Sequence, residues 1–171
     1  MKSIIFLLLI FEFSFASLID TKSFDADFKQ VVTDEHGKKL EYTGHLKALS
    51  PRYALWEYET PMKKSIYINP SRITIIEPEI EQVIIRKLSL DFDFLKIINN
   101  AKEISKDNYV TSIDDTKYVI KIKNHLITSI SYKDEFDNSV NILFNNQKKN
   151  EHISKEIFRP SIPKDFDIID R

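Results

Sequence analysis

The chain has 171 residues with 25 basic and 26 acidic side chains, so its formal net charge is only −1. This balance argues against nucleic-acid binding as the main task, because affinity for nucleic acids comes from clustered Lys and Arg. The chain contains no cysteine, which excludes disulfides, thiolate zinc sites and catalytic thiols, and its two glycines are too few for a dinucleotide fingerprint.

The first residues of the chain predict a secretory signal peptide. Lys2 precedes an apolar run over 4–11, and Ser14 and Ala16 are the small residues of a cleavage site. The apolar run is too short for a membrane-spanning helix, which needs about 20 apolar residues. We expect a signal peptide over 1–16 and a soluble, exported chain over 17–171 that folds as one domain. A buried N-terminal helix is the alternative.

The exported part reads as a series of short strands rich in Ile, Phe and Tyr. Alternating runs predict strands over 24–33, 40–48, 53–59, 64–69, 72–77, 82–88, 108–113, 117–123, 126–132 and 139–145. The polar turn over 34–37 joins the first two strands as a hairpin, and Asp114 with Asp115 marks another hairpin turn. Pro160 and Pro163 make the segment 157–169 an extended edge or loop, with room for a short strand over 166–169.

One segment departs from this pattern of strands. The apolar residues that recur at helical spacing over 90–104 are Phe94, Leu95, Ile97, Ile98 and Ala101. They predict one amphipathic helix with Asp91 or Asp93 as its N-cap. A shorter helical turn is predicted over 18–22.

This succession of elements favours a mainly β fold, either a barrel or a strongly curved antiparallel sheet. The concave face of such a sheet has to be filled, and the single apolar helix is the obvious element to fill it. Strand alternation places three pairs on a common side, namely Ile66 with Ile68, Ile73 with Ile75, and Val83 with Ile85. For any single residue an ordinary packed core is a better explanation than a cavity.

Motifs for catalysis and for metal binding are weak. The four histidines His36, His45, His125 and His152 have no metal-ligand spacing, and no G-x-S-x-G motif is present. The acidic residues beside Pro78, together with Asp91 and Asp93, are the candidates for a catalytic carboxylate pair, so an exported β-barrel hydrolase is a distant alternative. We expect a protein with no enzymatic activity, no cofactor and no metal ion.

Four short motifs follow one another along nearly all of the exported chain. An F-x-A-x-F-x-Q pattern near the start is matched by Phe24, Ala26, Phe28 and Gln30. A Pro followed by W-x-Y-x-x-P is matched by Pro51, Trp56, Tyr58 and Pro61, and a later turn by Pro78 and Gln82. The closing F-x-x-x-x-P-x-x-x-D-V-I pattern is matched by Phe158, Pro163, Asp167, Ile168 and Ile169. In this order the motifs resemble those of the periplasmic outer-membrane lipoprotein carrier family, LolA.

Two departures from the family concern the lid over the barrel. The family commonly has an Arg immediately before the first Pro, implicated in holding the lid closed, and Ser50 stands in its place here. Arg52 is the nearest substitute and therefore the lid-closing candidate. The family usually has a full N-terminal helix, of which only 17–22 would remain, so the lid is either smaller or relies on the helix at 92–101.

The resemblance implies a half-open antiparallel β-barrel, lidded by helix around an apolar cavity, in a monomeric periplasmic protein. It implies a carrier that takes acylated lipoproteins from an inner-membrane ABC exporter, LolCDE, and delivers them to the outer membrane directly or through the receptor LolB. The residues expected in the cavity or lid are Trp56, Tyr58, Ile66, Ile68, Ile75, Val83, Ile85, Phe94, Leu95 and Ile98. The main alternative is a periplasmic module that senses lipids or lipoproteins on the same fold and binds a membrane-bound regulator.

Overall fold

The fold consists mostly of strands, and the computed structural model describes it for residues 20–87 and 93–170. The first six strands are β1 (Ser23–Thr33), β2 (Lys39–Leu49), β3 (Tyr53–Thr60), β4 (Lys64–Asn69), β5 (Arg72–Glu77) and β6 (Gln82–Lys87). After the helix α1 (Phe94–Asn99) come β7 (Lys102–Ser105), β8 (Asn108–Ile113), β9 (Thr116–Lys123), β10 (Leu126–Lys133), β11 (Ser139–Lys149) and β12 (Asp167–Asp170). Two 3-10 turns, η1 (Pro78–Ile80) and η2 (Lys155–Phe158), lie in the connections.

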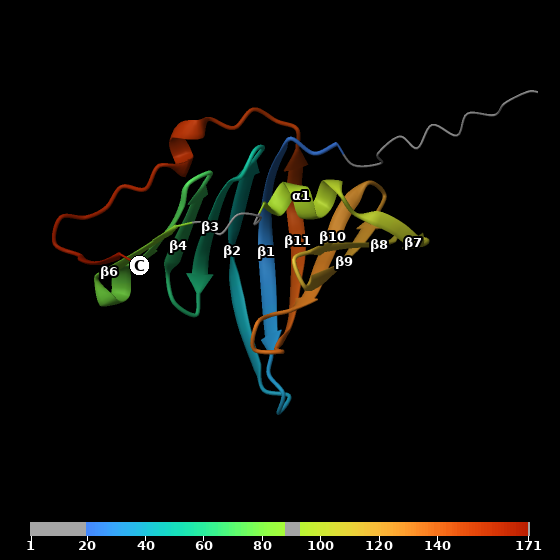
Figure 1. Ribbon diagram of the computed structural model, residues 1–171, viewed down its shortest axis with the longest axis horizontal. Helices are drawn as coiled ribbons and strands as arrows, with labels where there is room; N and C mark the ends of the chain where they lie inside the picture. Colours follow the sequence, from blue (N-terminus) through green and yellow to red (C-terminus); the bar gives the residue numbers. More distant parts are fainter. Residues whose placement is uncertain (1–19, 88–92, 171) are drawn as a thin grey trace, which may run out of the picture.

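Within the described ranges, the twelve strands form one sheet in the order β12-β6-β5-β4-β3-β2-β1-β11-β10-β9-β8-β7. Neighbours are antiparallel except that β12 runs parallel to β6. Figure 1 shows α1 in front of the central strands β1 and β11, while the β1–β2 hairpin turn lies at the far end of these strands. This confirms the prediction of a mainly β fold, a strongly curved and open antiparallel sheet with a helix on its concave face.

The strand predictions are confirmed along the chain. Each predicted strand up to the one over 139–145 begins within one residue of an observed strand. Apolar and polar residues alternate wherever one face of a sheet is buried, so the sequence marks these strands clearly. β12 forms where a short final strand is expected, at the edge of the sheet.

The helix is shorter than predicted. α1 follows Asp93, whose carboxylate accepts the backbone N–H of Leu95 at 3.0 Å, which confirms the expected N-cap. The prediction that the helix continues to residue 101 is wrong, because the chain leaves the helix after Asn99 and forms β7 from Lys102. β7 satisfies its backbone by pairing with β8, and Ile104 on this edge strand is 67% exposed.

Two N-terminal predictions concern residues at the start of the chain. The signal peptide over 1–16 lies outside the described residues. The helical turn over 18–22 is wrong for residues 20–22, which lead into β1 without helical structure. The backbone N–H and carbonyl groups of Thr21 instead form hydrogen bonds with the side chain of Asn99 in α1.

The main apolar core lies on the concave face. Phe24, Ala26 and Phe28 of β1 point into it, and their cross-strand neighbours on β2 and β11 share this face. Gly44 of β2 is opposite Phe28, and a Cβ at Gly44 would lie 2.1 Å from the carbonyl oxygen of Glu57. The close approach of β2 and β3 at this point therefore requires glycine.

A smaller apolar layer lies on the convex face of β3 to β6. Phe158 of η2 is 1% exposed, and its ring centroid lies 5.5 Å from that of Tyr53. Leu55 and Ile76 are buried on the same side of the sheet. The C-terminal segment thus covers the convex face before β12 joins β6.

Candidate functional site

One end of the concave face is closed by α1. The ring centroid of Phe94 lies 5.6 Å from those of Phe24 and Trp56. Leu95 and Ile98 from the same helix are 2% and 0% exposed. The structure therefore brings five of the predicted site residues into one closed apolar core, namely Trp56, Ile68, Phe94, Leu95 and Ile98.

A pair of hydrogen bonds holds α1 to the start of β1. The backbone N–H of Thr21 donates to Asn99 Oδ1 at 2.9 Å, and Asn99 Nδ2 donates to the carbonyl oxygen of Thr21 at 2.9 Å. Sequence reasoning missed Asn99, because an Asn at the end of a helix is typical of a cap and its partner lies 78 positions away. The helix is thus fastened by polar contacts as well as by apolar packing.

The other end of the concave face, toward the β1–β2 turn, carries half-buried side chains. Tyr58, Ile66 and Ile75 from the predicted set lie there, and Leu40 is 47% exposed. Register pairs Ile66 with Trp56 and with Ile75, so these side chains continue the core outward from α1. We call this end the open trough, and its concave side chains are Val32, Leu40, Tyr42, Tyr58, Ile66, Ile75, Ile113, Tyr118 and Tyr132.

Hydrogen-bond donors are placed within the open trough. The Tyr58 hydroxyl donates to Gln30 Oε1 at 3.0 Å. Burial raises the pKa of Tyr58, and the nearby phenols of Tyr132 and Tyr42 raise this pKa further. Burial also raises the pKa of Tyr132, to about 12. These phenols therefore stay protonated and act as donors in neutral solution.

Two predicted cavity residues lie on the opposite face. Register pairs Ile84 with the concave Ile75 and pairs Val83 with Ile76. Val83 and Ile85 therefore face the convex side, and their prediction as cavity residues is wrong. The sequence reads Val-Ile-Ile here without alternation, because the C-terminal segment buries the convex face as well.

The lid-closing candidate lies in the turn between β2 and β3. Arg52 is half-buried and has a positive φ of 61°. Ser50, which replaces the Arg expected from the resemblance, donates its backbone N–H to the carbonyl oxygen of Lys22 at 2.9 Å. The role of Arg52 in closing the lid stays a prediction.

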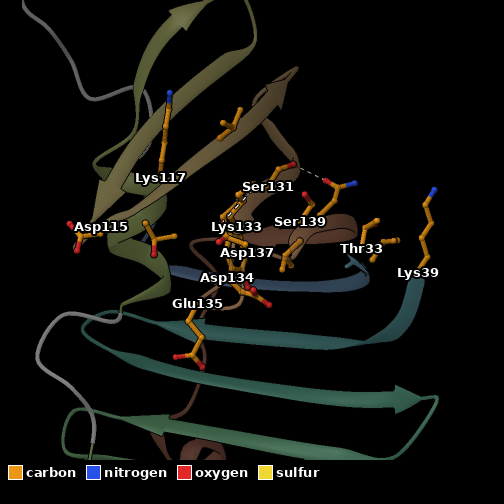
Figure 2. Close-up of a pocket in the computed structure, with 16 residues that line it drawn as sticks. Thr33, Lys39, Asp115, Lys117, Ser131, Lys133, Asp134, Glu135, Asp137 and Ser139 are labelled. Carbon is orange, nitrogen blue, oxygen red and sulfur yellow. Dashed lines mark hydrogen bonds and ion pairs between the residues drawn. The ribbon is translucent and has the colours of Figure 1, made fainter. Parts of the chain in front are cut away.

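A pocket of about 1130 Å³ lies beside the turns that connect the strands at the hairpin end of the sheet. Figure 2 shows Asp115 and Lys117 on one side of this pocket and Thr33 and Lys39 on the other. Most of its lining residues are charged or polar. Such a lining suits water better than a hydrocarbon chain, so the open trough is the better candidate for an apolar ligand.

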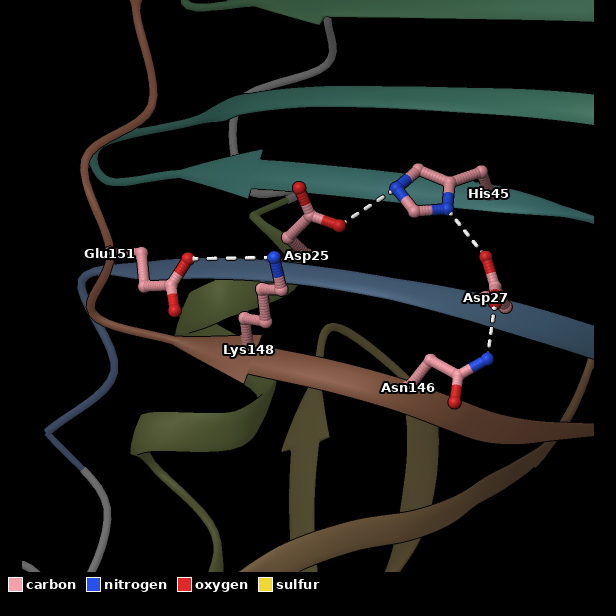
Figure 3. Close-up of polar contacts among 6 residues, drawn as sticks. All are labelled: Asp25, Asp27, His45, Asn146, Lys148 and Glu151. Atoms are coloured by element: carbon pink, nitrogen blue, oxygen red, sulfur yellow. Dashed lines mark hydrogen bonds and ion pairs between the residues drawn. The ribbon is translucent and has the colours of Figure 1, made fainter.

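A polar cluster occupies the convex face of β1, β2 and β11. His45 Nδ1 lies 2.7 Å from Asp27 Oδ1, and His45 Nε2 lies 2.8 Å from Asp25 Oδ1 (Figure 3). Asn146 Nδ2 donates to Asp27 Oδ2 at 2.8 Å. The hydrogen bonds from Asn146 and from His45 lower the pKa of Asp27. The cluster links three adjacent strands on the side of the sheet away from α1.

Across 20–87 and 93–170, no group of three or more His, Cys, Asp or Glu is arranged to hold a metal ion. In the same parts of the chain, no helix is long and apolar enough to cross a membrane.

Sequence comparisons agree on one family. The family model described as outer membrane lipoprotein carrier protein LolA matches residues 20–119. A protein of Campylobacter jejuni named outer-membrane lipoprotein carrier protein is 41% identical over 155 residues, which cover 91% of this chain and 90% of that relative. A Helicobacter pylori protein of the same name is 40% identical over 137 residues, which cover 80% of this chain and 73% of the relative.

Solved structures with low sequence identity share the fold. A LolA superfamily protein from Nitrosomonas europaea aligns with a TM-score of 0.53 at 11% identity, covering 83% of this chain and 92% of that one. An uncharacterized conserved protein from Thermus thermophilus aligns with a TM-score of 0.52 at 12% identity, covering 88% and 91%. At these identities the similarity concerns the fold alone.

Proposed function

Because the chain belongs to the family of the outer membrane lipoprotein carrier protein LolA, we propose that it carries acylated lipoproteins through the periplasm to the outer membrane. The observation that carries this proposal is the concave face of the sheet. It is apolar beneath α1, which closes one end, and at the other end it is half-exposed and lined by apolar side chains together with tyrosines. A carrier needs such a surface, which can cover hydrocarbon and release it again.

The magnitude of the task favours a covered binding site. Burial of hydrocarbon is worth about 0.8 kcal/mol per CH₂ group, so one sixteen-carbon chain represents about 12 kcal/mol. Acyl chains therefore cross an aqueous compartment only under an apolar cover. Phe94, Leu95 and Ile98 place such a cover on a short helix, which can move more easily than a strand of the sheet.

We assign two roles to the predicted residues on the concave face. Ile66, Ile75 and Tyr58 of the open trough receive the acyl chain first. The residues beneath and within α1 make room for the chain when the helix lifts, and they are Trp56, Ile68, Phe94, Leu95 and Ile98. Arg52 acts in returning the lid to its closed position.

The family and the names of the relatives support a lipoprotein cargo and a place in the Lol pathway. We propose an inner-membrane ABC transporter of the LolCDE type as the donor, and LolB or the outer membrane itself as the acceptor. The protein reaches the periplasm through a signal peptide over 1–16 and acts as a monomer. Transfer between partners needs a difference in affinity and no bond chemistry, so the protein is not an enzyme.

A release assay tests the proposal. Purified protein is added to spheroplasts of the source bacterium that retain lipoproteins at the inner membrane. We expect lipoproteins to appear in the soluble fraction in complex with the protein. Ile66→Glu places a charge in the open trough and should abolish release, whereas Leu143→Glu on the convex face is the matched control and should not.

The assay also separates the carrier from its main alternative. Absence of release by the folded protein would contradict the carrier function and favour a lipoprotein-sensing module. Release by Ile66→Glu at the normal level, with its fold confirmed by circular dichroism, would show that the trough is not the binding surface.

A further inference from the structure

Four tyrosines from four different strands meet on the open trough. Tyr42 and Tyr58 come from β2 and β3, and Tyr118 and Tyr132 come from β9 and β10 on the other side of β1. Register places Tyr42 opposite Gln30, and places Tyr132 opposite Val140, which is itself paired with Val32. All of these side chains therefore share the concave face.

Aromatic contacts fix the positions of these phenols. The ring centroids of Tyr42 and Tyr58 are 5.8 Å apart, and those of Tyr118 and Tyr132 are 5.1 Å apart. The Tyr58 ring also lies 5.1 Å from the ring of Phe28, and its hydroxyl donates to Gln30 Oε1. A pocket of about 430 Å³ opens beside Tyr118 and Tyr132. We refer to Tyr42, Tyr58, Tyr118, Tyr132 and Gln30 as the tyrosine band.

The chemistry of the tyrosine band differs from that of the core under α1. The closed end is lined by the aromatic rings of Phe24, Trp56 and Phe94. The band instead presents hydroxyl and amide groups, which are polar but carry no formal charge. A polar group that loses its water and finds no new partner costs about 1–3 kcal/mol. A ligand that fills the open trough with hydrocarbon alone would incur this cost at the hydroxyl of Tyr132 and at the amide N–H groups of Gln30, whose Oε1 already accepts from Tyr58.

A ligand that brings neutral acceptors to the band avoids this cost. Every acyl group ends in a carbonyl, whose oxygen accepts hydrogen bonds from phenols. We propose that the tyrosine band binds the ester carbonyls of the acylated cargo, with the hydrocarbon tails pointing under α1 and the polar end of the anchor at the mouth. This inference rests on the proposed function and deepens it, because it gives the cargo one direction in the trough.

Lys64 beside Tyr58 is one charged group that offers an alternative anchor, and Lys133, Asp134 and Glu135 line the pocket beside Tyr132. The Nζ of Lys64 lies 4.9 Å from the centroid of the Tyr58 ring. A free carboxylate would be drawn to this ammonium group, while an ester carbonyl has no charge to be attracted. Comparing an ester with a ligand that lacks the carbonyl therefore isolates the contribution of the phenols.

The test measures the affinity of the purified protein for two matched ligands, by fluorescence of its only tryptophan, Trp56. Dioctanoylglycerol carries two ester carbonyls, and the corresponding dioctyl ether of glycerol carries none. We expect Tyr132→Phe to weaken binding of the ester about tenfold and to leave binding of the ether within about twofold. Tyr58→Phe should weaken the ester less, because the Tyr58 hydroxyl already donates to Gln30 Oε1. Tyr67→Phe, on the convex face, is the matched control and should change neither affinity.

Each result decides the inference. Equal affinity of the wild-type protein for ester and ether would overturn it while leaving the carrier function standing. Equal weakening of both ligands by Tyr132→Phe would also overturn it, since it would assign the Tyr132 ring to packing alone. Binding of neither ligand would count against the inference and the proposed function together. An infrared carbonyl band of the bound ester that shifts in wild type, and returns toward the free position in the variants, would support direct hydrogen bonding.

Discussion

The hydrogen bonds between Asn99 and Thr21 make a measurable prediction about the lid. Asn99→Ala removes both bonds, each of which has a donor–acceptor distance of 2.9 Å. A neutral hydrogen bond contributes about 0.5–1.5 kcal/mol net, so the pair is worth about 1–3 kcal/mol. Each 1.4 kcal/mol changes an equilibrium tenfold, so opening of α1 should become about fivefold to a hundredfold more frequent.

Trp56 reports this opening directly. It is 7% exposed and lies 5.6 Å from the ring of Phe94, so lifting α1 exposes it to a soluble quencher. We expect stronger acrylamide quenching in Asn99→Ala and faster hydrogen exchange at the amide of Thr21. Asn100→Ala is the matched control, because Asn100 is exposed and has no such tether to β1 among the hydrogen bonds of the described residues. Unchanged quenching and exchange in Asn99→Ala would refute the assignment of these bonds as the fastening of the lid.

Three further predictions concern other parts of the fold. Gly44→Ala should lower the free energy of unfolding in urea by about 3 kcal/mol, because its Cβ would lie 2.1 Å from a carbonyl oxygen; an unchanged midpoint would contradict this close approach. Phe158→Ala should cost about 3–5 kcal/mol in the same titration, because the side chain is 1% exposed against the convex face; a loss below about 1 kcal/mol would argue that the C-terminal segment is loosely attached. Asp27→Asn should lower the melting temperature at pH 7 but not at pH 2. Folding lowers the pKa of Asp27 from its ordinary value of 3.8, so the ionised carboxylate stabilises the fold at pH values above 3.8. This stabilisation is lost as the pH falls through the pKa of Asp27 in the folded protein. Equal shifts at both pH values would contradict an electrostatic role.

Local sequence patterns were sufficient to predict most of the strands and the start of the helix. Alternation in β1 and β2 reflects one buried face, and Asp93 caps α1 through a contact only two residues away. The ordered motifs around Phe24 and Trp56 were sufficient for the family resemblance, which the comparisons confirm. In each case the physical cause lies within a few residues of the signal.

The sequence by itself therefore determined the strand-rich fold, the position of its helix and its family. Only the tertiary structure decided which residues share the concave face. Val83 and Ile85 fall on the convex side because the C-terminal segment, far along the chain, buries that side and removes the alternation that a sequence pattern needs. Asn99 reaches Thr21 across 78 positions, and the tyrosine band gathers residues from five strands. Such contacts depend on register and curvature, which no local pattern of residues encodes.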